Sequence, residues 1–179
     1  MEEKGLVTYA SKYGATAGIA EKIGETLRQA GLPTDVLPVK QVRNLAAYKA
    51  VVLGSAVYIG QWRKEAVKFL KGHKNLLKQR PVWMFSSGPT GEGDAVEILR
   101  GWRFPSKLQP LVESIQPHDI VVFHGNVDEE KINSIEKSIL NNVKALIGDY
   151  RDWNAITTWA TSIANTLKES EPALLLGDT

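Results

Sequence analysis

Short apolar runs alternate along this chain with segments in which apolar residues recur every three or four positions. Apolar runs rich in β-branched residues predict strands at residues 6–10, 35–39, 50–57, 82–86 and 119–125. Helical spacing predicts helices at residues 16–30, 63–78, 132–147 and 153–167. Strands that alternate with helices in this way pair in parallel, with helices on both faces of the sheet. The pattern therefore predicts an α/β fold, a three-layer sandwich around a five-stranded parallel sheet.

Two stretches of the chain carry no clear pattern. Residues 92–110 show at most one helical turn, and residues 169–179 show no periodicity. At 179 residues the chain has the length of one domain. We therefore predict a single domain over residues 1–168, followed by a flexible C-terminal tail over residues 169–179.

The composition narrows the chemistry more than the fold. With 43% hydrophobic and 23% charged residues, the chain is typical of a folded globular protein. It contains no cysteine, which excludes a disulfide framework, a zinc–thiolate site, an iron–sulfur cluster and a thiol nucleophile. A redox function therefore requires a bound organic cofactor.

Charge and hydropathy argue against nucleic-acid binding and against a membrane-spanning segment. The net charge of +2, without long runs of like charge, predicts no nucleic-acid partner. No apolar run reaches the length of a membrane-spanning helix, and the N-terminal apolar stretch is too short for a signal peptide. We therefore expect a soluble, cytoplasmic protein without a transmembrane segment.

The loop after the first predicted strand has the composition of an anion-binding site. Residues 11–16 read Ser-Lys-Tyr-Gly-Ala-Thr and offer two hydroxyls, a glycine and consecutive N–H groups at the start of a helix. The same residues suit a simple helix cap, so the loop alone leaves both interpretations open. It lacks the glycines of a dinucleotide fingerprint and the Gly-Lys pair of a triphosphate loop, which disfavours NAD and nucleoside triphosphates.

The loops after the third and fourth predicted strands also carry residues suited to a ligand. Tyr58 and Trp62 flank Gly60, and aromatic rings there either cover a planar ligand or pack under the next helix. We favour packing for Trp62 and leave both roles open for Tyr58. Residues 86–91, Ser-Ser-Gly-Pro-Thr-Gly, offer backbone groups to the polar edge of a ring. Parallel sheets bind ligands at the carboxyl ends of their strands, so the three loops indicate one site.

Three segments of the chain resemble a known family. They are the loop at residues 11–16, the segment Gly-Ser-Ala-Val-Tyr-Ile-Gly-Gln-Trp at residues 54–62, and the segment Gly-Asp-Tyr-Arg-Asp-Trp at residues 148–153. They resemble the flavodoxin superfamily, and the last is similar to the branch that contains menaquinone-dependent protoporphyrinogen dehydrogenase. The resemblance spans residues 6–167. It implies a parallel sheet of strand order 2-1-3-4-5 and bound FMN. FAD is disfavoured because the loop at residues 11–16 offers a terminal phosphate site and the chain lacks a fingerprint for a pyrophosphate.

The resemblance also implies which residues hold FMN. Its phosphate would be held by Ser11, Tyr13, Gly14, Ala15 and Thr16, and its ring would lie between the other two loops. Lys12 either adds charge or is solvated, and we favour solvation. The complete set of candidate cofactor-binding residues is Ser11, Lys12, Tyr13, Gly14, Ala15, Thr16, Ser55, Ala56, Val57, Tyr58, Ile59, Gly60, Ser86, Ser87, Gly88, Pro89, Thr90 and Gly91. We expect no catalytic side chain and no metal ligand, because a flavin itself carries the electrons.

The expected function is electron transfer or flavin-dependent oxidoreduction. Tyr58-Ile59 stands where the protoporphyrinogen enzymes are expected to carry Arg-Tyr, and the stretch at residues 88–105 is longer than theirs. The sequence pI of about 8.7 does not provide the acidic surface that carrier flavodoxins use. The sequence therefore favours an oxidoreductase whose partner is a redox protein, a quinone or a small molecule. A protoporphyrinogen dehydrogenase-type enzyme with a quinone acceptor is the alternative.

Two other function classes are compatible with such a fold. A phosphorylated receiver domain needs acidic residues after the first and third strands, where this chain has Ser11 and Ser55. A flavin-free module that binds a partner would keep the fold without the cofactor. The visible absorbance of the purified protein separates such a module from a flavoprotein.

Overall fold

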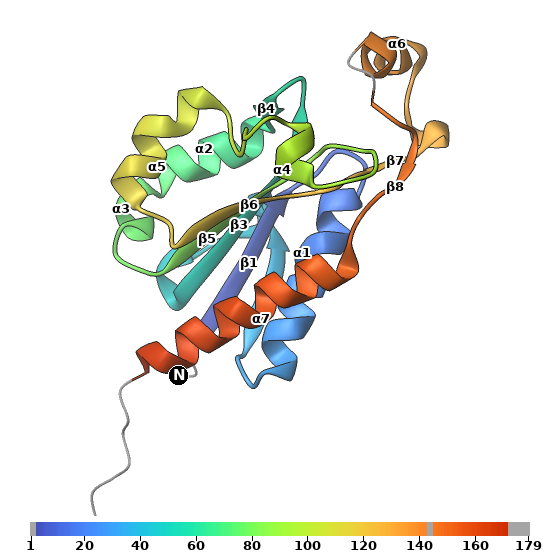
Figure 1. Cartoon of the computed structure of the whole chain (residues 1–179). Coiled ribbons are helices and arrows are strands. Elements are labelled where there is room, and N and C mark those ends of the chain that lie inside the picture. Colours follow the sequence, from blue (N-terminus) through green and yellow to red (C-terminus); the bar gives the residue numbers. More distant parts are fainter. Residues whose placement is uncertain (1–2, 143–144, 172–179) are drawn as a thin grey trace, which may run out of the picture.

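The computed structural model describes residues 3–142 and 145–171 and shows a parallel sheet between two helical layers (Figure 1). Its strands are β1 (Lys4–Ala10), β2 (Thr34–Pro38), β3 (Tyr48–Tyr58), β5 (Val82–Ser87) and β6 (Asp119–Phe123). They lie in the order β2-β1-β3-β5-β6, and each neighbouring pair is parallel. Because β4 is only a short hairpin strand beside β3, this is the expected order 2-1-3-4-5. The predicted three-layer α/β/α sandwich is confirmed.

One face of the sheet is covered by α1 (Ala15–Gln29) and α7 (Trp153–Ser170). The core on this side contains Val7, Ile19, Ile23, Val52, Phe85, Ile156 and Ile163. The other face is covered by α2 (Lys64–Gly72), α3 (Lys74–Leu77) and α5 (Gln109–Ile115). Its core contains Leu6, Val51, Leu53, Phe69, Leu70, Leu77, Met84 and Ile115. Neighbours such as Leu6 and Val7 belong to different cores because successive strand residues point to opposite faces.

Short elements connect these layers. Turns of 3₁₀ helix are η1 (Val39–Gln41), η2 (Leu45–Ala47), η3 (Ser106–Leu108) and η4 (Glu129–Lys131). The strand β4 (Gln61–Trp62) pairs antiparallel with the end of β3. The stretch at residues 92–110, which showed no clear pattern in sequence, contains α4 (Ala95–Ile98) as well as η3. Asp94 begins α4, because its carboxylate accepts hydrogen bonds from the N–H groups of Val96 and Glu97.

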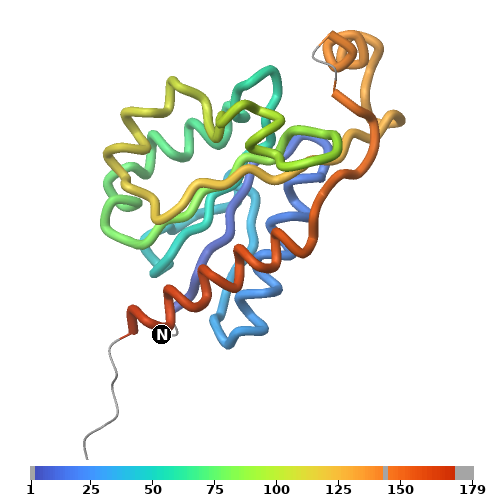
Figure 2. Tube along the Cα trace, in the orientation of Figure 1, coloured from blue at the N-terminus to red at the C-terminus, as the bar shows by residue number. Residues whose placement is uncertain are grey.

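Two predicted helices differ from those observed. The helix predicted at residues 63–78 is interrupted at His73, which separates α2 from α3. The long helix predicted at residues 132–147 is wrong in extent, because the described residues of this stretch are helical only in α6 (Ser134–Asn142). The chain then enters β8 (Gly148–Asp149), which pairs antiparallel with β7 (Asn126–Val127). The pairing of β7 with β8 brings the two ends of the intervening segment together, and α6 in that segment lies outside the sandwich (Figure 2).

The C-terminal helix is slightly longer than predicted. α7 continues to Ser170, so the first residues of the predicted tail are helical. The remainder of that tail, residues 172–179, lies outside the described residues. Within residues 3–142 and 145–171, no helix has the length and apolar character needed to span a membrane.

Candidate functional site

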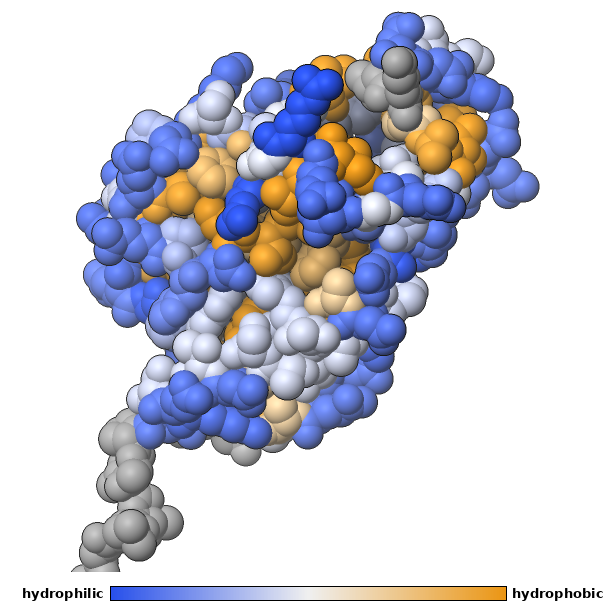
Figure 3. Space-filling model, viewed as in Figure 1, coloured by the Kyte–Doolittle hydropathy of each residue, from blue (hydrophilic) through white to orange (hydrophobic). Residues whose placement is uncertain are grey.

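A cavity of about 530 Å³ opens at the carboxyl ends of the central strands. It is walled by the loops after β1, β3, β5 and β6, by the α4 segment and by the α6 segment. The chain leaves β1 toward β2 on one side and reaches β3 on the other, so the cavity lies where the winding reverses. Its volume is within the usual range of small-molecule sites, about 300–1,000 Å³. Hydrophobic residues are exposed in the region of α4, with charged residues beside them (Figure 3).

The loop after β1 leaves hydrogen-bond donors available at one wall of this cavity. Gly14 precedes α1 with a φ of 92°, a conformation that glycine adopts without strain, and it provides no side-chain cap. The N–H groups of Ala15, Thr16 and Ala17 find no acceptor within the described part of the chain. The first turn of α1 also lacks an acidic residue. Free N–H groups at a helix start, without a compensating carboxylate, are the arrangement that binds a phosphate.

The hydroxyl groups of Ser11 and Thr16 add further hydrogen-bond donors to this loop. The Ser11 Oγ accepts a hydrogen bond of 3.0 Å from the Gly14 N–H, which leaves the Ser11 proton free for another acceptor. Thr16 is 1% exposed and lines the cavity. The loop therefore offers hydroxyl as well as backbone donors.

Lys12 is exposed, as we expected from sequence, but its ammonium also pairs with Glu136 of α6, a contact that the sequence did not indicate. The Glu136 carboxylate accepts hydrogen bonds from the Lys12 ammonium and from the Tyr13 hydroxyl. These bonds lower the pKa of Glu136 to about 2, and the bond to Glu136 raises the pKa of Lys12 to about 12. The Lys12 Nζ also lies 5.0 Å and 5.1 Å from the ring centres of Tyr13 and Tyr58. The α6 segment is therefore fastened to the loop after β1 by an ion pair.

The loop after β3 is a tight hairpin. Tyr58 pairs with Gln61, so Ile59 and Gly60 form a two-residue turn with φ of 49° and 66°. Positive φ at both positions defines a type I′ turn, in which a β-branched residue is strained. Ile59 is nevertheless 61% exposed and lines the cavity. Tyr58 is half-buried and lines the cavity as well.

The loop after β5 is held against the end of β6. The Gly88 N–H donates to the Phe123 carbonyl at 3.1 Å, and the Gly125 N–H donates to the Pro89 carbonyl at 3.0 Å. The two loops are so close that a Cβ on Gly125 would lie 3.0 Å from the Gly88 oxygen. The Thr90 hydroxyl is buried and has no hydrogen-bond partner among the described residues. This wall of the cavity is therefore built largely from backbone.

His124, which follows β6, holds the same loop. Its ring nitrogens lie 3.1 Å from the Pro89 carbonyl oxygen and 2.6 Å from that of Gly93. It does not line the cavity. Its contacts indicate a structural role.

Most of the predicted site residues meet at the cavity. Those that line it are Ser11, Lys12, Tyr13, Ala15, Thr16, Ala56, Val57, Tyr58, Ile59, Gly60, Ser87, Gly88, Pro89 and Thr90. Gly14 and Gly91 do not line it but give their loops the positive φ that each turn requires. Ser55 is fully buried below the cavity, where its hydroxyl accepts from the Arg63 N–H at 2.9 Å.

Ser86 is also placed in the core rather than at the cavity. Its hydroxyl accepts from the Trp62 Nε1 at 2.8 Å and donates to the Arg103 carbonyl at 2.6 Å. Trp62 is 5% exposed, so the packing role that we favoured for it agrees with the structure. Both residues hold the two loops together from beneath.

Several residues that line the cavity were not predicted from the sequence. They are Arg63, Ile98, Leu99, Trp102, Gly125, Asn126, Val127, Asp128, Ile132, Glu136, Ile139, Leu140 and Ala145. The cluster of apolar residues around position 100 was a usable signal, because it falls in a stretch without core periodicity. The α6 residues gave no separate signal, since their spacing resembles that of a core helix.

The residues present fit FMN. Free N–H groups and hydroxyls at the start of α1 suit a phosphate, and the mainly apolar walls with Tyr58 suit a flat aromatic ring. Within the described residues, no cluster of three metal-ligating side chains occurs. A phosphorylated organic cofactor is therefore the ligand class that this cavity accommodates.

Comparisons with known proteins agree with this geometry. Protoporphyrinogen IX dehydrogenase (quinone) of Escherichia coli strain K12 is 21% identical over 183 residues, which cover 90% of this chain and 95% of that protein. A flavodoxin from the domain Archaea superposes with a TM-score of 0.61 at 14% identity, covering 92% of this chain and 99% of that one. The flavodoxin of Streptococcus pneumoniae TIGR4 gives a TM-score of 0.58 at 17% identity, covering 90% and 98%. The flavodoxin domain family matches residues 6–154, so this chain belongs to that family, which implies FMN as its cofactor.

Proposed function

We propose that this chain is an FMN-dependent oxidoreductase that passes electrons to an apolar small molecule, with a quinone as the first candidate. The observation that carries this proposal is the composition of the cavity walls. Beyond the three loops expected to hold FMN, the α4 segment contributes Ile98, Leu99 and Trp102, and the α6 segment contributes Ile132, Ile139 and Leu140. An apolar enclosure suits an apolar substrate, whereas a protein partner needs only an exposed cofactor edge.

The loop after β1 would hold the phosphate of FMN through Ser11, Thr16 and the first N–H groups of α1. Tyr58, Ile59 and the backbone after β5 would border its ring. When bound, FMN supplies reversible uptake and release of electrons and protons. The ion pair between Lys12 and Glu136 would keep the α6 segment closed over the site and limit the entry of water.

The relative from Escherichia coli supports a quinone as acceptor, because its name records a quinone and the similarity covers 90% of this chain. Protoporphyrinogen is accordingly the first electron donor to test. A cytoplasmic location remains a prediction from the sequence. A carrier that serves a protein partner remains the alternative, and the experiment below separates the two.

The test is the reoxidation of the protein after anaerobic reduction. We expect a short-chain naphthoquinone to reoxidise it rapidly and cytochrome c to do so slowly. Ile139→Glu, which puts a charge into the apolar wall, should slow the reaction with quinone by about tenfold or more. Ile135→Glu is the matched control, because Ile135 lies on the same helix but is 73% exposed and does not line the cavity. Reoxidation by cytochrome c alone, or equal effects of both variants, would overturn the proposal.

A further inference from the structure

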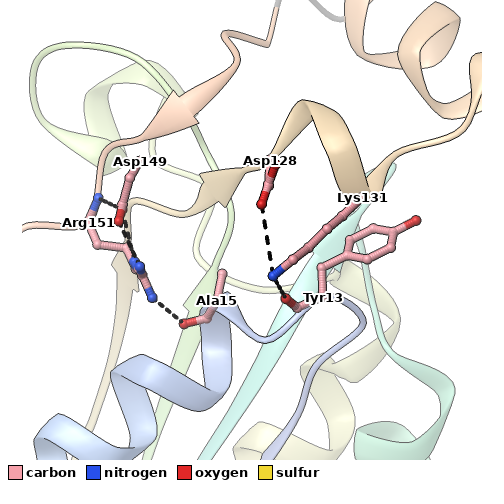
Figure 4. A network of polar contacts seen from close by, with 6 residues as sticks. All are labelled: Tyr13, Ala15, Asp128, Lys131, Asp149 and Arg151. Carbon is pink, nitrogen blue, oxygen red and sulfur yellow. Dashed lines mark hydrogen bonds and ion pairs between the residues drawn. The ribbon is translucent and has the colours of Figure 1, made fainter.

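Two basic side chains from the C-terminal half of the chain contact the backbone of the loop at residues 11–16 (Figure 4). The Lys131 Nζ lies 3.4 Å from the Tyr13 carbonyl oxygen, and the Arg151 Nη1 lies 3.4 Å from the Ala15 carbonyl oxygen. Neither side chain lines the cavity. They reach the loop from outside the site, and each binds a carbonyl rather than a position open to a ligand.

Arg151 is held firmly in this position. Its Nε and Nη2 donate to the two carboxylate oxygens of Asp149 at 2.9 Å and 2.7 Å, a two-point ion pair. Its guanidinium lies 4.7 Å from the ring centre of Trp153. Gly18 in α1 makes room for it, since a Cβ there would lie 2.7 Å from Nη1. The segment at residues 148–153 is therefore in defined contact with the first turn of α1.

The geometry of a peptide unit links these contacts to the phosphate site. The C=O and N–H of one trans peptide point in opposite directions, so a cation at the oxygen orients and strengthens the N–H as a donor. The Ala15 carbonyl shares its peptide unit with the Thr16 N–H, one of the free donors at the start of α1. The Tyr13 carbonyl shares its unit with the Gly14 N–H, which donates to Ser11 Oγ. Arg151 thus acts on the Thr16 N–H, and Lys131 acts on the Ser11 hydroxyl.

We propose that Arg151 and Lys131 are positioning residues for the phosphate of FMN. They fix two peptide units of the loop so that its donors converge on the anion, and they do so without touching the ligand. The Asp149 carboxylate largely neutralises the charge of Arg151, so orientation rather than net attraction is its contribution. The inference rests on the proposed binding of FMN at this loop, and it adds a role for residues outside the cavity.

The experiment compares the affinities of the apoprotein for FMN and for riboflavin, which differ only by the phosphate. Each affinity is measured by quenching of flavin fluorescence. Arg151→Met should weaken FMN binding by about tenfold, equivalent to about 1.4 kcal/mol, while riboflavin binding changes by less than about twofold. Lys131→Met should act in the same direction by about threefold, because the side chain is 56% exposed and its contact is weaker. Being exposed, Lys131 can be replaced without loss of folding.

Arg80→Met is the matched control. Arg80 also binds backbone carbonyls, those of Leu45 at 2.9 Å and Tyr48 at 2.6 Å, but at the start of β3, the end far from the cavity. Its loss should lower the melting temperature and leave the ratio of FMN to riboflavin affinity unchanged.

The outcomes are separable. A selective loss of FMN affinity in both test variants supports the proposal. An equal loss for FMN and riboflavin would show that Arg151 only stabilises the site as a whole and would overturn the proposal, as would unchanged affinities in both variants. If the unmodified protein bound neither flavin, the proposed function itself would fail, and this inference with it.

Discussion

Ser11 and Thr16 carry the most specific chemistry at the scale of single residues. Both line the cavity, and both belong to a loop whose helix has free N–H donors. A hydrogen bond to a charged group contributes about 1.5–3 kcal/mol, so loss of both hydroxyls in Ser11→Ala with Thr16→Val should weaken FMN binding about a hundredfold. Calorimetric titration of the apoprotein measures this loss. Riboflavin binding is the internal control, and an unchanged affinity for FMN would place the phosphate elsewhere.

Tyr58 and Trp62 make a second prediction, because they are close in sequence and opposite in environment. Tyr58 lines the cavity, whereas Trp62 is 5% exposed and donates to Ser86. Tyr58→Ala should change the visible spectrum and the reduction potential of the bound flavin more than the melting temperature of the apoprotein. Trp62→Phe should do the reverse. The same response from both variants would contradict the assignment of Tyr58 to the cofactor.

Residue types at strand ends could be predicted from sequence, but their directions were only partly predictable. Ser55 and Ser86 are small polar residues in the expected segments, yet both point into the core. Their hydroxyls form hydrogen bonds with backbone groups of Arg63 and Arg103. Alternation along a strand decides this, and a shift of one residue reverses it. The partner of Lys12 was not predictable, because Glu136 is 124 residues away.

At the scale of elements, the attachment of α6 to the loop after β1 depends on pH. The pKa of Glu136 is lowered from 4.5 to about 2 by hydrogen bonds from Lys12 and Tyr13. A carboxyl with a lowered pKa stabilises the folded state fully above 4.5, and this contribution is lost as pH falls toward 2. Glu136→Gln should therefore lower the free energy of unfolding clearly at pH 7 and much less near pH 3. Urea denaturation at both pH values measures it.

The raised pKa of Lys12 makes its stabilising contribution fail at high pH rather than at low pH. Its contribution is full below 10.5 and is lost as pH rises through about 12, so the attachment is intact throughout the neutral range. Glu25→Gln serves as the control for Glu136→Gln, because Glu25 pairs with Lys22 on the exposed surface of α1. A destabilisation by Glu136→Gln of the same size at both pH values would argue against the ion pair as the fastening contact.

Contact between β3 and β5 gives a prediction about packing. A Cβ on Gly54 would lie 2.0 Å from the Cζ of Phe85, which is fully buried. Gly54→Ala should therefore destabilise the fold by about 1–3 kcal/mol or more, through overpacking. Gly72→Ala is the control, since nothing lies within 4 Å of its added Cβ in α2, and it should stabilise by up to about 1 kcal/mol. Thermal denaturation compares the two, and equal melting temperatures would contradict this close packing.

The segment between β7 and β8 contains the predicted helix that differs most from the structure. The spacing of Ile132, Ile135 and Ile139 indicates one long amphipathic helix, but Ile135 is 73% exposed and Ile139 lines the cavity. The described helix ends at Asn142, and Asp149 pairs with Asn126, which is distant in sequence. Local periodicity reports that a face is apolar, and it does not report what the face packs against.

For the whole molecule, the sandwich could be predicted from local sequence signals, whereas part of the cavity wall could not. Five short apolar runs and their alternation with helices were sufficient for the sandwich, because each signal is local. Three of the cavity walls followed, since they are loops at the ends of those strands. The walls from the loop after β6 and from the α4 and α6 segments did not, because their position depends on contacts between parts of the chain far apart in sequence.

Binding of FMN in this cavity is tested by the mass of the cofactor released from the purified protein. The loop after β1 provides one terminal phosphate site without a dinucleotide fingerprint, so we expect FMN, close to one per chain. Release of FAD would contradict the phosphate assignment. A colourless protein that takes up no added FMN would contradict the assignment of this cavity to a flavin.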